Sequence, residues 1–336
     1  MLYRKLGNTG KKLSAIGMGT NRFAVTDLKD ENGLDRAADI LYKAIEYGVN
    51  YIDCGHTYAM GQAEKIVKLA LEKIRKSQLV CYTSTKVMYA EDHTSDAARR
   101  RLEKSLEVMG INKVTFGFCW KVSSYNEFEK IVKHGGIYDG LYKAKEEGLI
   151  EHLCISSHAS PDETIKILQT GLFEACMISC NVLNVNNYEK LLEFAASNGI
   201  GIFTMNSLGG GVITKQEEIN HLLFKKDDSK LTIVQKALCS LYSNKAITCM
   251  LSSVEDLAEL EENTSLFTPE NVKYIEKQKL VKNLKLPRYC TKCRYCRECP
   301  AEIPIADMMY AYSNRLFTEL MYGYGSRDKL KVVGGG

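Results

Sequence analysis

The feature that most constrains the fold is a repeated alternation between short apolar runs and longer segments of helical period. Eight apolar runs, rich in β-branched and aromatic residues, recur at a spacing of roughly thirty residues, the length of one strand–helix–strand unit. They read SAIGMGT, VNYIDC, LVCYTSTK, VTFGFC, EHLCISS, ACMISCN, IGIFTMN and AITCMLSS. Between them lie amphipathic stretches such as GLDRAADILYKAIEYG and AEKIVKLALEKI. Apolar strands separated by helices indicate a parallel sheet that helices cover.

Eight such units predict an α/β fold, a (β/α)8 TIM barrel. The opening YRKLGNTGKKLS has a Gly-containing turn between two short alternating runs, which predicts an N-terminal hairpin at the bottom of the barrel. An open doubly wound sheet is the alternative, but no Gly-x-Gly-x-x-Gly follows a strand. We place the barrel at residues 1–282 and a small C-terminal segment, rich in cysteine, at residues 283–336.

Charge and composition narrow the choice of partners. The 336 residues carry a formal net charge of only +4, spread along the chain, which gives no argument for a nucleic-acid or a membrane partner. We expect a small-molecule or peptide substrate instead. The first residues, MLYRKLGNTGKKLS, contain no apolar signal region, and no run of about 18 apolar residues occurs, so we expect a cytoplasmic protein.

Three chemically matched side chains follow two neighbouring strands. The second strand ends in IDCGHTY, with Asp53 and Tyr58, and the third ends in STK, with Lys86. Taken singly, such an Asp is more often a helix cap and such a Lys is more often solvated. In a barrel, however, the C-terminal strand ends carry the chemistry and meet at one rim. A Tyr becomes a useful acid when an ammonium stabilises its phenolate, and a buried ammonium needs a carboxylate, so we predict that Lys86 activates Tyr58 and Asp53 holds Lys86.

These motifs, together with others in the same order, resemble the aldo-keto reductase superfamily, and within it the branch with a cysteine-rich tail of iron-sulfur type. The likeness covers nearly the whole chain. It is carried by LGNTGKKLSAIGMGT, YIDCGHTYAMGQAEK, STK, ISSH, LGGG, SSVEDLAELEEN, CTKCRYCRECP and IPIADMMYAYSNRL. The resemblance implies a carbonyl or enone reductase in which a nicotinamide cofactor, NAD(H) or NADP(H), delivers hydride and Tyr58 delivers the proton.

The chain departs from the family at the fourth catalytic position, where relatives carry a His at the end of strand four. Counting from Gly110 through INKVTFGFCWKV places Trp120 there, and that stretch contains no histidine. An indole donates one hydrogen bond but does not titrate. Either Trp120 or another group orients the substrate, or the reaction is not ordinary ketone reduction. His56, three residues after Asp53, is either a substrate contact or a rim histidine without a role.

The resemblance also implies the cofactor site. The implied positions are Ser156, Ser157, Asn181, Ser252, Ser253, Glu262 and Asn263. Met177 stands at the usual Gln position, and Met205 stands where many relatives stack an aromatic ring. The Arg that usually binds a 2'-phosphate is replaced by Glu259. An anion at this place repels a phosphate, so NAD should bind no worse than NADP.

Four of the twelve cysteines crowd into the tail motif CTKCRYCRECP. Cys290, Cys293, Cys296 and Cys299, followed by Pro300, resemble a bacterial ferredoxin run. Thiols at every third residue favour a [4Fe-4S] cluster over tetrahedral zinc, which prefers two separated Cys pairs, and four free thiols are a third interpretation. The other eight cysteines are scattered through apolar segments, which is typical of buried intracellular thiols.

Three classes of function stay open at this point. The first is a reductase that uses NAD(H), with the cluster as a structural clamp or an electron relay. The second is a barrel enzyme that takes electrons from the cluster, or does acid/base chemistry, without a dinucleotide. The third is a non-catalytic barrel that serves as a binding or electron-transfer partner.

Overall fold

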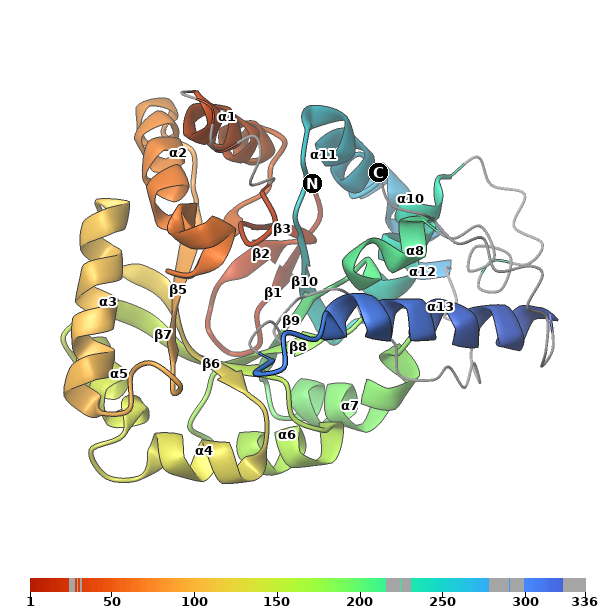
Figure 1. Ribbon diagram of the computed structural model, residues 1–336. Helices are drawn as coiled ribbons and strands as arrows, with labels where there is room; N and C mark the ends of the chain where they lie inside the picture. The colour runs from red at the N-terminus through yellow and green to blue at the C-terminus, as the bar shows by residue number, and fades with distance from the viewer. Residues whose placement is uncertain are drawn as a thin grey trace.

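A computed structural model describes residues 1–23, 28, 30, 32–215, 224, 231–277, 290 and 299–322. Within these residues, parallel strands close into one barrel in the order β10-β3-β4-β5-β6-β7-β8-β9, with helices around the outside (Figure 1). The closed barrel confirms the predicted (β/α)8 fold, and the open sheet is excluded. The strands are β3 (Ile16–Gly19), β4 (Tyr51–Asp53), β5 (Tyr82–Met88), β6 (Val114–Val122), β7 (Ile150–Ser157), β8 (Ala175–Ser179), β9 (Gly201–Met205) and β10 (Ile247–Ser252).

The helices bury one face each against the strands. In the first of them, Ala37, Leu41 and Ala44 are buried, at the spacing of a single helix face. The sixth shows how the sequence sets a helix start, because Ser160 and Glu163 form a capping box there. The helices are α1 (Gly33–Glu46), α2 (Ala63–Ser77), α3 (Ser95–Met109), α4 (Tyr125–Val132), α5 (Ile137–Glu146), α6 (Pro161–Leu168), α7 (Glu189–Ser197), α8 (Val212–Lys215), α10 (Ile233–Tyr242), α11 (Leu257–Thr264), α12 (Val272–Lys277) and α13 (Ile305–Tyr322).

The floor of the barrel is the predicted N-terminal hairpin. Its strands, β1 (Tyr3–Lys5) and β2 (Lys12–Ser14), pair antiparallel. Leu6 and Leu13 are fully buried and belong to the apolar cluster inside the barrel. Leu6 fits because β9 begins with Gly201, where a Cβ atom would lie 2.4 Å from the leucine side chain. The hairpin therefore closes the bottom, and the open end is the one at which the strands finish.

Strand alternation decides which side chains reach the barrel interior. Phe116 and Phe118 of β6, Met177 of β8 and Phe203 of β9 belong to the interior cluster. Their neighbours along the same strands, such as Cys119, pack instead against the surrounding helices. The same alternation governs the polar residues that end the strands, and so it determines which of them can enter a site at the open end.

The described part of the cysteine-rich tail lies against α13, the long blue helix of Figure 1. The backbone N–H of Cys290 donates to Ser313 Oγ at 2.8 Å, and Tyr310 of the helix packs against the barrel core. The predicted boundary between residues 282 and 283 lies outside the described residues, so the domain division stays a prediction. None of the described helices has both the length and the apolar character needed to cross a membrane.

Candidate active site

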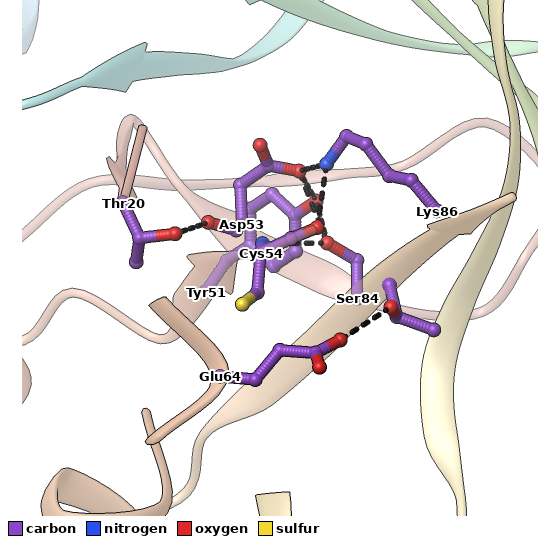
Figure 2. Close-up of polar contacts among 8 residues, drawn as sticks. Thr20, Tyr51, Asp53, Cys54, Glu64, Ser84 and Lys86 are labelled. Carbon is purple, nitrogen blue, oxygen red and sulfur yellow. Dashed lines mark hydrogen bonds and ion pairs between the residues drawn. The ribbon is translucent and has the colours of Figure 1, made fainter. Parts of the chain in front are cut away.

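A buried ion pair lies at the open end of the barrel. Asp53 is the last residue of β4, and Lys86 lies on the neighbouring strand β5. Lys86 Nζ is 2.5 Å from Asp53 Oδ1, and the lysine and aspartate side chains are 0% and 4% exposed (Figure 2). Because both charges have left water, further hydrogen bonds must compensate for their lost hydration.

Those hydrogen bonds come from the same two strands. Asp53 Oδ1 also accepts from the Tyr51 hydroxyl at 2.9 Å and from Ser84 Oγ at 3.0 Å, and Lys86 Nζ donates to the Cys54 carbonyl at 2.9 Å (Figure 2). Burial, followed by the nearby Asp53 charge, raises the pKa of Tyr51 well above its usual value, so Tyr51 stays a neutral donor. Sequence reasoning missed Tyr51 and Ser84. The two-residue period of a strand could have found them, since each lies two residues before a predicted site residue.

Tyr58 reaches the ion pair from the turn that follows β4. The turn is a short 3-10 segment, Tyr58–Gly61, in which Ala59 and Met60 have φ values of 48° and 54°, a region that few non-glycine residues adopt. The Tyr58 side chain is buried, and its ring centroid lies 5.0 Å from Lys86 Nζ. The structure thus brings together Asp53, Tyr58 and Lys86, the three residues that the strand ends predicted.

Trp120 also lies at this site. Its ring meets the Tyr58 ring edge-on, with centroids 5.4 Å apart and planes at 81°. The pairing of β6 with β7 shifts register between Cys119 and Val122, and Lys121 has a φ of 61°. A bulge of this kind re-aims side chains next to active sites. The indole therefore lies beside Tyr58, at the position where relatives in the family carry a histidine.

A cavity of about 390 Å³ extends from this cluster across the open end of the barrel. Asp53 and Tyr58 line one end of it, and four predicted cofactor residues line it as well, namely Ser252, Ser253, Glu262 and Asn263. Met177 and Met205 lie along its wall. Sequence reasoning missed the further lining residues Gly19, Asn21, Arg22, Asn206, Ser207, Leu208, Gly210, Gly211, Thr214, Val234, Leu251 and Glu255. We call this cavity the groove.

Three other predicted cofactor residues, Ser156, Ser157 and Asn181, lie near the barrel rim in different surroundings. Ser156 is fully buried, and its β7 position pairs in register with Met177, a groove residue. The neighbouring Ser157 turns the other way, and its hydroxyl lies 2.6 Å from Thr164 Oγ1 on α6. The Asn181 side chain bonds to backbone groups: it donates to the Asn206 carbonyl and accepts from the Leu183 N–H. None of these three residues is among those that line the groove, so their cofactor role stays a prediction.

The part of the groove next to α11 is acidic. Glu255, Glu259 and Glu262 all line it at the start and first turns of α11. Arg22 is the one cation among the lining residues that the structure describes, and its Nη1 donates to the Gly210 carbonyl at 3.1 Å. Glu259, which replaces the phosphate-binding Arg of the family, therefore belongs to a group of three carboxylates that line the groove.

The predicted metal ligands are only partly described. Cys290 and Cys299 are partly exposed, whereas Cys293 and Cys296 lie outside the described residues. Cys290 Sγ lies 3.5 Å from the Ala306 carbonyl oxygen at the start of α13. Among the residues that the structure describes, no three His, Cys, Asp or Glu side chains converge as a metal site. The cluster therefore stays a prediction.

The buried lysine–carboxylate pair, the tyrosine beside it and the groove lie together at the open end of the (β/α)8 barrel, where barrel enzymes carry their active sites. The sequence model of the aldo/keto reductase family matches residues 15–279, and the chain belongs to this family. It is therefore an oxidoreductase.

Two curated relatives illustrate the range of the family. The L-galactose dehydrogenase of Arabidopsis thaliana is 23% identical over 288 residues, which is 79% of this chain and 88% of the relative. The NADH-specific methylglyoxal reductase of Escherichia coli (strain K12) is 25% identical over 227 residues, which is 62% of this chain and 68% of the relative.

Solved structures agree with the fold. The holo form of an aldo-keto reductase from Bacillus halodurans superposes with a TM-score of 0.66 at 16% identity, covering 84% of this chain and 99% of that one. An aldo/keto reductase from Klebsiella pneumoniae in complex with NADP and acetate superposes with a TM-score of 0.61 at 15% identity, covering 80% and 93%.

Proposed function

We propose that the protein is a reductase that uses NAD(H) to reduce a carbonyl group or an activated C=C bond, with Tyr58 as proton donor. The observation that carries this proposal is the position of Lys86. Its Nζ lies 2.5 Å from Asp53 Oδ1 and 5.0 Å from the centroid of the Tyr58 ring, and Asp53 and Tyr58 both line the groove. Support for a nicotinamide cofactor comes from the NADP complex of the Klebsiella structure and from the NADH-specific Escherichia relative.

The residues along the groove suit a dinucleotide. Ser156 does not line the groove, but it pairs in register with the groove residue Met177, and its buried Oγ has no hydrogen-bond partner among the described residues. It is therefore our candidate for a bond to the nicotinamide carboxamide. Asn263 and Glu262 offer amide and carboxylate groups at the far end of the groove, where an adenosine would lie. Met205 offers an apolar, polarisable side chain to the nicotinamide ring.

When bound, a reduced nicotinamide supplies the hydride. Tyr58 then gives its phenolic proton to the substrate atom that gains negative charge, so that a C=O becomes an alcohol and a phenolate remains. Lys86 stabilises that phenolate, because a nearby ammonium favours the ionised form. Asp53 keeps Lys86 in place and is itself held by Tyr51 and Ser84. Solvent returns the proton to Tyr58 before the next cycle.

The acidic end of the groove favours NAD(H) over NADP(H). A 2'-phosphate brought toward Glu259 and Glu262 would meet like charges, whereas a ribose hydroxyl could donate to a carboxylate. The proposed cofactor is therefore NAD(H), although the Klebsiella structures contain NADP and NADPH.

Titration with NADH and NADPH under nitrogen tests this proposal. Trp120 is the only tryptophan in the chain, and its ring lies beside Tyr58 at one end of the groove. Bound NADH should quench Trp120 emission by energy transfer while cofactor emission rises, and Trp120→Phe should remove the transfer but retain binding. A protein that binds neither dinucleotide would contradict the proposal and would favour a barrel enzyme without a dinucleotide or a non-catalytic partner.

We also propose that the four tail thiols, Cys290, Cys293, Cys296 and Cys299, hold a [4Fe-4S] cluster. The support is their spacing and the following Pro300. Anaerobically purified protein should be brown with about four irons per chain, as expected for a cubane cluster, and Cys293→Ala should bleach it. A colourless protein that carries zinc would contradict the cluster.

A further inference from the structure

We infer that Tyr51 and Ser84 are positioning residues whose hydroxyls keep the buried ion pair in its charged form and so make it easier for Tyr58 to give up its proton. Neither residue is among those that line the groove, so both act through Asp53 and Lys86 rather than on a ligand. The catalytic part of this inference rests on the proposed function, whereas the effect on the ionisation of Tyr58 does not.

The donors to Asp53 all meet at one of its two carboxylate oxygens. This oxygen, Oδ1, accepts from Lys86 Nζ at 2.5 Å, from the Tyr51 hydroxyl at 2.9 Å and from Ser84 Oγ at 3.0 Å (Figure 2). Ser84 Oγ in turn accepts from the Cys54 backbone N–H at 3.3 Å, which leaves the serine hydrogen for Asp53. One ammonium and two neutral hydroxyls therefore share a single carboxylate oxygen.

The two hydroxyls are fixed and shielded from water. Tyr51 and Ser84 are both 0% exposed. The Tyr51 ring contacts those of Phe116 and Phe203, with centroids 5.5 and 5.0 Å away, and these contacts hold its hydroxyl toward Asp53. Because burial and then the charge of Asp53 raise the pKa of Tyr51 well above its usual value, the hydroxyl remains a donor at neutral pH.

These hydrogen bonds decide where the proton of the ion pair resides. In a buried pair, the lysine proton can pass to the carboxylate and leave two neutral groups, since neither ion is hydrated. Hydrogen bonds to a carboxylate favour its ionised form and therefore oppose this transfer. The positive charge stays on Lys86 Nζ, which lies 5.0 Å from the centroid of the Tyr58 ring. That charge stabilises the phenolate that remains when Tyr58 has given its proton.

Other titratable groups near the site do not replace the two hydroxyls. Burial raises the pKa of the Cys54 thiol to about 12 and that of the Cys249 thiol well above its usual value, so both stay neutral. The buried carboxylate of Glu64 on α2 accepts from a threonine hydroxyl of β5, and His56, in the turn after β4, is paired with Glu91. Within the described ranges, none of these side chains hydrogen-bonds to the ion pair.

The ionisation of Tyr58 can be measured without cofactor or substrate. The ultraviolet absorbance of tyrosinate is followed against pH in a protein and in the same protein with Tyr58→Phe, and the difference between the two curves reports Tyr58 alone. We expect Tyr51→Phe to move the midpoint to higher pH by at least about half a unit, because the lost hydrogen bond had favoured the charged pair. Ser84→Ala should move it in the same direction, and the double variant should move it further.

Tyr242→Phe is the matched control. The Tyr242 hydroxyl, at the end of α10, is also buried, but it has no hydrogen-bond partner among the described residues. Its removal should leave the Tyr58 midpoint unchanged. An unchanged midpoint in folded Tyr51→Phe and Ser84→Ala proteins would overturn the inference. So would a wild-type Tyr58 that shows no ionisation before the protein unfolds.

The pH dependence of turnover tests the catalytic part, with NADH and benzaldehyde as probes. In Tyr51→Phe, kcat at neutral pH should fall about three- to tenfold with KM unchanged. The alkaline fall of kcat should move to higher pH, because Tyr58 acts only while it is protonated. An equal loss of kcat at every pH would mean that Tyr51 merely supports the fold. A shifted Tyr58 titration in a protein that reduces no carbonyl compound would support the positioning role and contradict the proposed function.

Discussion

Lys86 Nζ lies 2.5 Å from Asp53 Oδ1 in a place that solvent scarcely reaches, with the lysine side chain 0% and the aspartate side chain 4% exposed. Removing one partner of such a pair leaves an uncompensated buried charge, which costs about 3–5 kcal/mol. Asp53→Asn should therefore lower the free energy of unfolding by about this amount in urea titrations.

An exposed ion pair provides the contrast. Asp39 Oδ1 lies 2.5 Å from Lys73 Nζ, but its side chain is 63% exposed. Asp39→Asn should change the free energy of unfolding by less than about 1 kcal/mol, because water solvates both charges. If the two variants lost equal stability, burial would not be what makes the Asp53–Lys86 pair important.

The role of the Tyr58 hydroxyl can be separated from that of its ring. Tyr58→Phe keeps the edge-on contact with Trp120 and removes only the proposed proton donor. Turnover should fall at least about a hundredfold, the usual contribution of a general acid, with NADH binding unchanged. Single-turnover kinetics at saturating NADH measure this, and full activity in the variant would remove Tyr58 from the mechanism.

Cofactor choice should follow the charge of the groove. Glu259→Arg replaces an anion that lines the groove with a cation, and it should shift the ratio of the NADPH and NADH dissociation constants at least about tenfold toward NADPH. Glu193→Arg on α7 makes the same change of charge on an exposed position outside the groove and serves as the control. A ratio that responds equally to both variants would reflect net charge alone.

Acid should weaken the interactions of Glu174 with His152 and Lys145. Burial raises the pKa of Glu174, but its bonds to His152 and Lys145 outweigh this effect and lower the value to about 2. Because the folded pKa is depressed, the carboxylate stabilises the fold above the pKa of about 4.3 that a free Glu has, and this contribution disappears as the pH falls toward 2.

The Glu174→Gln variant tests this pH dependence. Since the Glu174 side chain is 34% exposed, solvent screening should limit its contribution near neutral pH to about 1 kcal/mol. Urea unfolding at several pH values should show a constant difference between wild type and Glu174→Gln above about pH 5, which shrinks below about pH 4. A difference that grew in acid would contradict the assignment.

The sequence predicted most of the fold because the alternation of strands and helices leaves little choice of topology. It also predicted Asp53, Tyr58 and Lys86, since barrel strands end at a common rim. We predicted both Ser156 and Ser157 as cofactor residues, although the two-residue period of a strand directs only one of the two side chains inward. Of the three carboxylates at the acidic end of the groove, Glu259 and Glu262 were placed there by the family resemblance, whereas Glu255 was missed because no local pattern encodes the course of the turn before α11.

The last barrel strand has a consequence for synthesis on the ribosome. Met250 of β10 pairs with Ile16 of β3, and Arg4 of the hairpin donates to the carbonyls of Asn244 and Ile247. Until β10 has emerged, β3 and β9 keep open edges and the hairpin lacks the two hydrogen bonds of Arg4. Unpaired edges of this kind invite intermolecular pairing. Nascent chains arrested before residue 247 should therefore aggregate, whereas chains released after residue 252 can close the barrel.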